Sequence, residues 1–324
     1  MNRAKSTHKA DRCLRCYESL SSGIYHEKCS IQLFGTKTPP QLQTTTAEVE
    51  NCAKELLKQR ITVTGVQKKL SLHFDHKSSN RLTIVGTLGG NYILKPPSPE
   101  YVQMPEIEDL SMSLAMICGI KTAKHGLIPM QDGSLAYITR RFDRENNTKI
   151  AVEDLCQLSE TLTENKYRLS SDLSSEKTGK IIRKFSSIPG DDVLRFFELL
   201  LFSYIIGNND MHLKNFSFIT QNPQRIVLSP AYDLLAVRLI ISVKEDPEEM
   251  ALSINGKKNT LKLTDWYQLG AKLKIPENVC ANIMKRFTSK QEELFQKIKL
   301  SFLRNDLKQQ FEALITSRIK LLTG

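Results

Sequence analysis

The chain of 324 residues contains no hydrophobic run long enough to cross a membrane. Its longest apolar stretch, near Phe202, falls well short of the roughly 20 residues that a transmembrane helix needs. The N-terminus, MNRAKSTHKADR, is charged and is followed by no apolar segment of the kind found in signal peptides. These absences argue against membrane insertion and secretion, and we expect a cytoplasmic protein with no membrane partner.

Pure basic runs and internal repeats are also missing. The net charge of +11 comes from 46 Lys and Arg against 35 Asp and Glu, and the excess is spread along the chain. A mildly basic surface suits an acidic partner or an RNA-bound substrate, or serves solubility alone. We therefore expect no direct sequence-specific binding of nucleic acid.

An odd number of cysteines, seven, in a chain without a secretory signal makes disulfides unexpected. Cys13 and Cys16 form one close pair, and after nine intervening residues His26 and Cys29 form a second. Such a Cys₃His set is the tetrahedral arrangement that Zn²⁺ prefers, with no open position for a reacting water. We expect a structural zinc site, and the alternative is four reduced residues in a frayed N-terminus.

The patterning predicts an α+β chain in three segments. Residues 1–46 would form the zinc segment and a Pro/Thr-rich linker, residues 47–143 a small lobe, and residues 144–324 a larger helical lobe. In the small lobe we expect a helix at 48–59 and antiparallel strands at 61–65, 69–74, 81–86, 91–96 and 135–142. In the larger lobe we expect helices at 152–162, 177–185, 191–206, 265–273, 277–287 and 290–322, and a hairpin at 251–257.

The polar side chains that follow the apolar run 196–206 suggest phosphoryl transfer. Asp210 and Asn215 have the Asp-x₄-Asn spacing of the protein-kinase catalytic loop, and Asp233 follows a short expected strand. An Asp can accept the proton of an attacking hydroxyl, while an Asn and a second Asp can hold Mg²⁺ on a triphosphate. The spacing alone is weak evidence, because Asp and Asn are common in turns.

Lys95 ends an expected strand, and Glu108 lies on the apolar helix that follows. A strand lysine paired with a helix glutamate grips the α- and β-phosphates in kinases. Alternatively, Glu108 is a solvated residue of an acidic first helical turn. Upstream, the segment 62–69 is rich in hydroxyls and positive charge, and Gly65 would let its backbone approach a phosphate. An ordinary hairpin explains that segment equally well.

Seven separate stretches carry a resemblance to one family: TGVQKKLSL (64–72), YILKP (92–96), EIEDLSMSLAMICGI (106–120), YITRRFDR (137–144), VEDLCQL (152–158), GNNDMHLKNFSF (207–218) and SPAYDLL (229–235). In this order they resemble the motifs of the HipA-type serine/threonine kinases, which are toxins of bacterial toxin–antitoxin systems. They cover about residues 60–260. The resemblance implies a two-lobed, protein-kinase-like α+β fold with a β-rich N-lobe and a C-lobe dominated by helices.

The resemblance also implies a role for each matching residue. Asp210 would be the catalytic base, Asn215 and Asp233 the magnesium ligands, and Lys95 the ATP phosphate ligand. Further nucleotide contacts are implied for Arg140 and Phe142 at adenine, Asp143 near the ribose, His212 near the nucleotide, Lys214 at a phosphate, and Thr64, Gly65, Val66 and Gln67 in the first loop. Thr62 and Thr64 match the region of a regulatory autophosphorylation site.

Three departures from the family pattern stand out. Ile107 replaces the usual Asn before the helix glutamate, and the regulatory hydroxyls are Thr rather than Ser. The zinc segment stands where longer members have an extra N-terminal subdomain. The chain therefore resembles the short, HipT-like form, and the implied antitoxin partners are a small HipS-like protein and a HipB-like DNA-binding protein.

The implied function is an ATP- and Mg²⁺-dependent serine/threonine kinase that phosphorylates an aminoacyl-tRNA synthetase, inhibiting translation and arresting growth. Autophosphorylation of the loop that contains Thr62 and Thr64 would regulate it, and negative charge beside the triphosphate would be inhibitory. Two other readings stay open: a catalytically silent kinase fold that sequesters a partner, and a kinase for a small molecule.

Overall fold

A computed structural model of the chain describes residues 11–49, 51–52, 69–74, 80–85, 89–145, 148–159, 174–221 and 224–323. The chain divides into two compact units. Unit 1 comprises residues 1–109, 123–147 and 300–303, and unit 2 comprises residues 110–122, 148–299 and 304–324. The N-terminal segment thus belongs to the same unit as the sheet, and the domain boundaries expected from the sequence stay a prediction.

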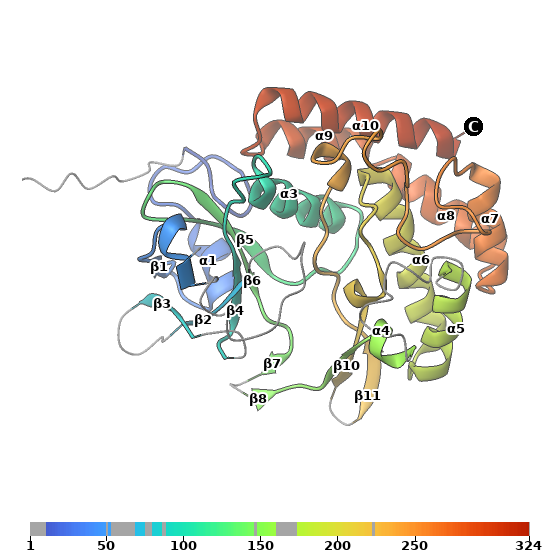
Figure 1. Cartoon of the computed structure of the whole chain (residues 1–324), viewed down its shortest axis with the longest axis horizontal. Helices are drawn as coiled ribbons and strands as arrows, with labels where there is room; N and C mark the ends of the chain where they lie inside the picture. Colours follow the sequence, from blue (N-terminus) through green and yellow to red (C-terminus); the bar gives the residue numbers. More distant parts are fainter. Residues whose placement is uncertain are drawn as a thin grey trace, which may run out of the picture. The chain divides into compact units, whose positions relative to one another are not determined.

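A mixed sheet forms the centre of unit 1 (Figure 1). Its strands, in spatial order, are β1 (Gln41–Leu42), β3 (Arg81–Ile84), β2 (Leu70–Phe74), β4 (Tyr92–Lys95), β6 (Leu135–Arg140) and β5 (His125–Pro129). β2, β4 and β6 pair antiparallel, with Leu72 opposite Tyr92 and Lys95 opposite Tyr137. β1, which lies in the stretch expected to be a linker, pairs with β3 in parallel and is an edge strand that the sequence analysis did not predict. The unit also contains β7 (Arg144–Glu145).

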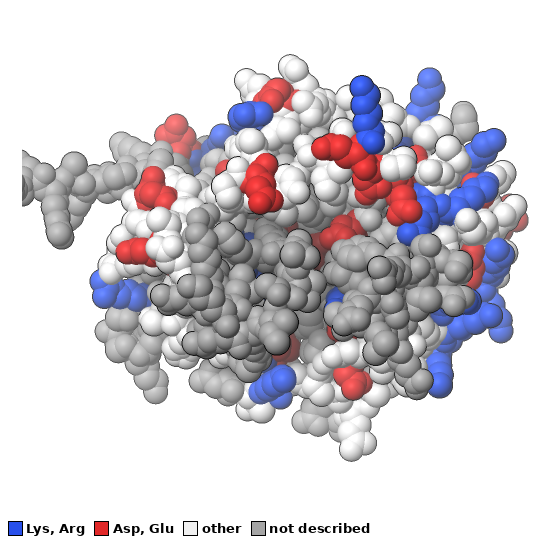
Figure 2. All heavy atoms as spheres, in the orientation of Figure 1, with Lys and Arg blue, Asp and Glu red and all other residues white. Residues whose placement is uncertain are grey.

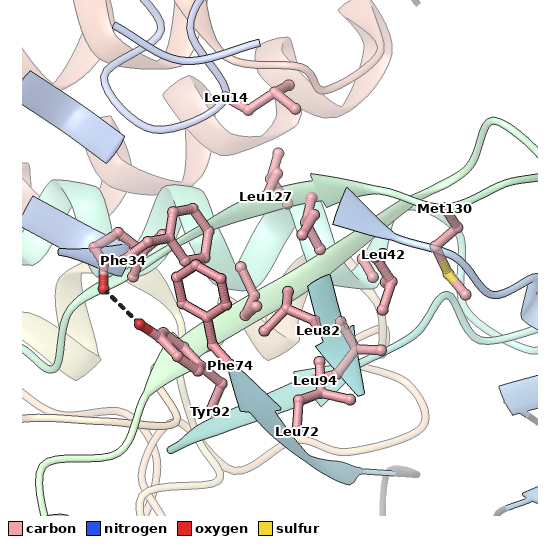
Figure 3. Close-up of a cluster of buried hydrophobic side chains, with 14 of the residues drawn as sticks. Leu14, Phe34, Leu42, Leu72, Phe74, Leu82, Tyr92, Leu94, Leu127 and Met130 are labelled. Atoms are coloured by element: carbon pink, nitrogen blue, oxygen red, sulfur yellow. Dashed lines mark hydrogen bonds between the residues drawn. The ribbon is translucent and has the colours of Figure 1, made fainter. Parts of the chain in front are cut away.

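The N-terminal segment shares one hydrophobic core with this sheet. Helix α1 (Glu27–Phe34) contributes Leu33 and Phe34, and the segment before it contributes Leu14 and Tyr25. Figure 3 shows the rings of Phe34, Phe74 and Tyr92 packed beside leucines of the strands. The Tyr92 hydroxyl donates to the Leu33 carbonyl at 3.2 Å. A short cysteine-containing segment with little core of its own is therefore stabilised by burial against the sheet.

Helix α6 (Pro189–Ile206) of unit 2 is largely buried and packs against α5, α8 and α10 (Figure 1). The described helices of the unit are α4 (Leu155–Leu158), α5 (Ser175–Phe185), α7 (Leu263–Lys272), α8 (Glu277–Thr288), α9 (Gln291–Leu300) and α10 (Asn305–Thr323). Its strands are β8 (Thr148–Lys149), β9 (Val152–Asp154), β10 (Ser217–Gln221) and β11 (Arg225–Leu228), with β10 between β9 and β11. Helix α3 (Met104–Ile117) runs from unit 1 into unit 2.

Two expectations for unit 2 were wrong, and a third holds in a short form. Val152–Asp154 pairs as a strand with β10, and Asp154 then caps α4, so the helix expected at 152–162 starts late. The hairpin expected at 251–257 is present as one antiparallel bridge, in which Ile254 and Lys257 exchange two backbone hydrogen bonds across a two-residue turn. The helix expected at 290–322 is broken at residues 301–304, where Phe302, which like Tyr17 belongs to unit 1, packs its ring on that tyrosine.

The strand expected at 61–65 lies outside the described residues, and so does most of the helix expected at 48–59.

Among the described residues, no helix is long and apolar enough to span a membrane. On the face shown in Figure 2, Lys and Arg side chains gather at the right, over α5, α7 and α8. The expected α+β class is confirmed.

Candidate active site

Helix α6 leads directly into the predicted catalytic loop. It ends at Gly207, whose φ of 70° lies in the left-handed region that glycine adopts readily. A Cβ at this position would lie 2.8 Å from side-chain atoms of both Arg238 and Leu314. Backbone conformation and close packing therefore both require glycine where the helix turns into the loop.

The loop exposes Asp210 and buries the functional residues beside it. The Asp210 side chain is 53% exposed, whereas His212 and Asn215 are each 8% exposed. Asn215 Nδ2 and the His212 N–H both donate to the Asp210 carbonyl at 2.9 Å. His212 Nε2 lies 3.8 Å from Asp210 Oδ1. An accessible carboxylate on a fixed backbone is suited to accept a proton from a bound hydroxyl.

Two residues outside the Asp-x₄-Asn stretch 210–215, Asn209 and Arg238, brace this loop. Asn209 Nδ2 donates to Asp246 Oδ2 at 2.6 Å and to the Glu248 carbonyl at 2.9 Å. The Arg238 guanidinium donates to the Asp246 and Glu248 carbonyls at 2.6 and 2.5 Å, and its N–H donates to the Gly207 carbonyl at 3.0 Å. The sequence analysis missed both residues. Asn209 had a signal, its place beside Asp210, but Arg238 had none because its partners are backbone carbonyls.

Asp233 has a φ of 59°, a left-handed conformation that costs energy for a residue with a Cβ. The preceding residue, Tyr232, accepts a hydrogen bond from Ser217 at 2.6 Å and donates to the Lys214 carbonyl at 2.8 Å. Burial raises the pKa of the Tyr232 hydroxyl above its usual range, so it stays protonated as a donor. Tyr232 thus fastens the segment before Asp233 to η2 (Leu213–Asn215), the short helix that carries Asn215.

A buried aspartate at the start of α6 holds the strand that leads to Asp233. Asp192 Oδ2 accepts from the Ser186 hydroxyl at 2.7 Å and from the Leu228 N–H at 2.9 Å. Arg195 donates to Asp192 Oδ1 at 2.9 Å and to the carbonyls of Leu228 and Ser229. The sequence analysis missed this pair because acidic residues in a first helical turn are usually solvated.

Asn215 also borders a cavity of about 200 Å³ in unit 2, which Arg195, Glu198 and residues 119–121 and 228–231 help to line. Asp210 and Asp233 do not line it. This cavity therefore contains one of the predicted magnesium ligands and neither of the two carboxylates.

In unit 1, Lys95 and Glu108 form a buried ion pair. Lys95 Nζ lies 2.6 Å from Glu108 Oε1, and the two side chains are 7% and 1% exposed. Lys95 Nζ also lies 5.6 Å from the centre of the Tyr137 ring. The solvated first turn considered for this helix is therefore not found: Glu108 is buried, and so is Asp109 beside it.

The residues expected at adenine and ribose follow β6 in unit 1. Arg140 is exposed at the end of that strand, and Phe142 is partly buried. The Asp143 carboxylate accepts from Arg141 at 2.9 and 2.7 Å and from Arg144 at 2.5 Å. Burial opposes the charged form of Asp143, but the two arginines outweigh it and lower its pKa. Asp143 is thus a carboxylate held by two arginines.

The predicted metal ligands of the N-terminus lie together. The ligand atoms of Cys13, Cys16, His26 and Cys29 are all within 4.8 Å of one another. Tetrahedral thiolate ligands of zinc lie roughly 3.8 Å apart, so a small adjustment would complete such a site. Cys16 Sγ lies 3.3 Å from His26 Nδ1, and His26 Nε2 lies 3.0 Å from the Ser19 carbonyl. That second contact would orient the ring toward a metal at Nδ1.

Two sets of predicted residues remain, Lys214 and the first loop. Lys214 is partly buried and follows Leu213 in η2. The first-loop residues lie outside the described part of the chain, so their role stays a prediction: Thr62, Thr64, Gly65, Val66 and Gln67.

Comparison with solved structures identifies the fold. The structure of HipA from Shewanella oneidensis, in its complex with HipB and operator DNA, matches with a TM-score of 0.68 and 21% identity, over 81% of this chain and 65% of that one. The crystal structure of the proinflammatory kinase CtkA from Helicobacter pylori matches with a TM-score of 0.54 and 15% identity, over 74% and 90%. The protein is therefore of the α+β class with a HipA- and CtkA-like kinase fold.

The sequence comparisons then identify the family. The family described as "HipA-like C-terminal domain" matches residues 61–295, and the chain belongs to it. "Putative kinase Y4dM" of Sinorhizobium fredii is 33% identical over 233 residues, covering 68% of this chain and 55% of its own length. "Serine/threonine-protein kinase toxin HipA" of Shewanella oneidensis is 26% identical over 217 residues, covering 61% and 47%. The chain spans about half the length of the curated relatives it matches.

Proposed function

We propose that this chain is an ATP- and Mg²⁺-dependent serine/threonine protein kinase. The observation that carries the proposal is the pair of sites just described: an exposed Asp210 on a braced loop with Asn215, and a buried ion pair of Lys95 with Glu108. A family match over residues 61–295 and relatives named as kinases support it.

The chemistry of these residues fits the proposed reaction. The substrate hydroxyl attacks the γ-phosphorus of ATP, the bond from that phosphorus to the bridging oxygen breaks, and ADP leaves. Asp210 accepts the hydroxyl proton. Lys95, paired with Glu108, neutralises the phosphates, and positioning and electrostatics supply most of the rate.

Two oxygen donors fit Mg²⁺, a hard cation that prefers them. Asn215 donates through Nδ2 to the Asp210 carbonyl. The other atom of its amide, Oδ1, is the oxygen that would bind the metal. Asp233 supplies a carboxylate on a segment fastened by Tyr232. Bound Mg²⁺ would neutralise charge on the β- and γ-phosphates.

The remaining assignments extend the proposal to the other predicted residues. Arg140 and Phe142 would contact adenine and Asp143 the ribose, with His212 and Lys214 near the nucleotide. Thr64, Gly65, Val66 and Gln67 would approach the phosphates. Phosphorylation at Thr62 or Thr64 would inhibit, because added negative charge repels the triphosphate.

For partners, we propose an aminoacyl-tRNA synthetase as the substrate, so that its phosphorylation inhibits translation in the cytoplasm. A small HipS-like protein and a HipB-like DNA-binding protein would be the antitoxins. The complex of HipA with HipB and operator DNA supports the second partner by fold likeness.

Phosphate transfer from γ-labelled ATP tests the proposal. Wild type and Asp210→Ala are each incubated with Mg²⁺, alone and with a bacterial lysate. We expect labelling of the chain or of a lysate protein by the wild type and labelling roughly 10²- to 10⁴-fold slower by Asp210→Ala, with ATP binding kept by both. Mass spectrometry of the labelled band then identifies the substrate and the modified residue. Equal labelling by the variant would overturn the role of Asp210, and ATP binding without transfer to any protein would favour a sequestering fold or a small-molecule kinase.

We also propose that Cys13, Cys16, His26 and Cys29 bind one structural Zn²⁺. The clustering of their ligand atoms within 4.8 Å supports it. Elemental analysis of the purified chain should give one zinc per chain, with none in Cys13→Ser/Cys29→Ser. A zinc-free, folded wild type that takes up no added Zn²⁺ would contradict the assignment.

A further inference from the structure

The N-terminal segment that holds the Cys/His cluster, residues 11–29, is bonded to the free side of β5. The Leu127 N–H donates to the Leu14 carbonyl at 3.0 Å, and the Tyr25 hydroxyl donates to the Leu127 carbonyl at 2.5 Å. Gly126 beside them leaves room for this contact, because a Cβ there would lie 2.7 Å from the Tyr25 hydroxyl. The segment therefore acts as a fixed part of unit 1.

Tyr17, directly after the ligand Cys16, extends from this segment toward helix α3. Its φ of 66° is a left-handed conformation, and its N–H donates to the Cys13 carbonyl at 2.9 Å. Its ring packs edge-on against Phe302 at 5.5 Å, and the residue is 1% exposed. The turn between the first two cysteines therefore sets where the Tyr17 side chain points.

The Tyr17 hydroxyl donates to Asp109 Oδ2 at 2.6 Å in the interior of unit 1. Asp109 Oδ1 lies 2.6 Å from Nδ1 of His125 on β5, and both residues are almost fully buried. His125 stacks on the Tyr137 ring at 6.1 Å. Both oxygens of a buried carboxylate are thus occupied, one by the N-terminal segment and the other by the sheet.

Asp109 directly follows Glu108 on α3, and the two residues have different partners. Successive residues of an α-helix point about 100° apart, so a contact at each restrains rotation of the helix about its own axis. Glu108 binds Lys95 at 2.6 Å, and Asp109 binds Tyr17 and His125. The two sets of contacts meet at Tyr137: the Lys95 ammonium lies 5.6 Å from the centre of its ring, and His125 stacks on the same ring.

We propose that Tyr17 is a positioning residue for the Lys95–Glu108 pair, and that the Cys/His segment makes ATP binding depend on bound metal. The inference rests on the proposed function, because it assigns Lys95 to the ATP phosphates. Without the Tyr17 hydroxyl, a buried carboxylate loses one of its two partners, which is costly in a low-dielectric interior. The first turns of α3 then relax toward another donor, and Glu108 moves away from Lys95.

Tyr17→Phe tests the inference, because it removes one hydroxyl and keeps the ring against Phe302. Tyr25→Phe is the matched control: it removes another buried hydroxyl of the same segment, one bonded to Leu127 and not to Asp109. The first readout is acylation of Lys95 by an amine-reactive reagent, followed by mass spectrometry. The second is the Kd for ATP with Mg²⁺, with Lys95→Ala as the reference for lost phosphate contact and circular dichroism as the check on folding.

We expect Lys95 to be protected in wild type and Tyr25→Phe, and to react at least about tenfold faster in Tyr17→Phe, since a buried paired amine is shielded from reagent. The Kd for ATP should rise about tenfold in Tyr17→Phe and stay within about twofold of wild type in Tyr25→Phe, one tenfold step being 1.4 kcal/mol. Chelation of the metal from wild type should reproduce both effects, and added Zn²⁺ should reverse them.

Equal protection of Lys95 in Tyr17→Phe, Tyr25→Phe and the chelated wild type would overturn the positioning role, whether or not the chain is a kinase. If Lys95 is exposed by Tyr17→Phe but wild type binds no ATP, the positioning holds and the proposed function fails. A Kd that rises equally in both tyrosine variants would reduce Tyr17 to a general stability contact and refute the inference.

Discussion

The candidate site residues of unit 1 and those of unit 2 differ in how far their charged side chains are exposed to water. In unit 1, Lys95, Glu108 and Asp109 are withdrawn from water, and each charge depends on a partner within 2.6 Å. In unit 2, the Asp210 carboxylate is 53% exposed while the residues that fix its backbone are buried. A buried charge that loses its partner destabilises the fold, whereas an exposed one leaves it almost unchanged. Removing a charge in the unit 1 group should therefore lower the stability of the fold, whereas removing the Asp210 carboxylate should lower activity with little change in stability.

Glu108→Ala should produce the largest loss of stability, about 3 to 5 kcal/mol, because it leaves the Lys95 ammonium buried without its carboxylate. Urea denaturation of wild type and variant measures it. Lys95→Met/Glu108→Leu, which removes both charges and keeps the volume, should recover most of the loss. A Glu108→Ala cost below about 1 kcal/mol would mean that Lys95 reaches water in the native state.

Asp192→Asn in unit 2 should cost about 2 to 3 kcal/mol, since a neutral amide replaces a carboxylate that accepts from Ser186, Arg195 and the Leu228 N–H. Thermal unfolding followed by circular dichroism provides the measurement. Asp191→Asn, the neighbouring exposed residue of the same helical turn, serves as the control and should shift stability by less than about 0.5 kcal/mol. Similar effects of the two changes would contradict the bracing role of Asp192.

Asp233→Gly should be about 1 kcal/mol more stable than Asp233→Ala, because glycine adopts the observed φ of 59° without the strain that a Cβ brings. Comparing the two variants cancels the loss of the carboxylate, which they share. Chemical denaturation of both variants measures the difference in their free energies of unfolding, and a more stable Asp233→Ala would contradict the strain at this residue. We expect neither variant to transfer phosphate, so Asp233→Gly should be the more stable variant without being active.

Asp143 should make a smaller, pH-dependent contribution. Its pKa is lowered in the folded chain, so its stabilisation is present above the ordinary aspartate pKa of 3.8 and is lost as pH falls through the lowered value. Urea midpoints measured from pH 7 down to pH 3 should fall less steeply for Asp143→Asn than for wild type. Parallel curves would show that Arg141 and Arg144 hold this carboxylate equally well in the unfolded chain.

Asp210→Ala should have the smallest effect on stability, within about 0.5 kcal/mol, because its side chain is exposed. The same change should lower phosphate transfer roughly 10²- to 10⁴-fold, the usual contribution of a positioned general base. Measuring the melting temperature and phosphate transfer on the same preparation tests the contrast with Glu108→Ala. A large drop in melting temperature would show that Asp210 supports the loop rather than the chemistry.

Local patterns predicted the elements that carry the candidate site. The apolar run before Gly207 is the buried helix α6 that the sequence predicted, and the strands at β2, β3, β4 and β6 lie within the expected ranges. Patterns failed where distant residues decide the structure. Val152–Asp154 becomes a strand because β10 pairs with it, and the last helix breaks where Phe302 packs on Tyr17.

The sequence by itself determined which reactive groups are present and how closely they are spaced: the Asp-x₄-Asn loop, the strand lysine and the Cys/His pairs. These are short-range properties, since a few intervening residues fix how far apart such side chains can be. Only the tertiary structure decided which acidic residue of α3 faces which partner. Tyr17 and Asp109 are 92 residues apart, and their hydrogen bond exists because burial of the N-terminal segment against the sheet brings them together. No local pattern in the chain encodes a contact of that kind.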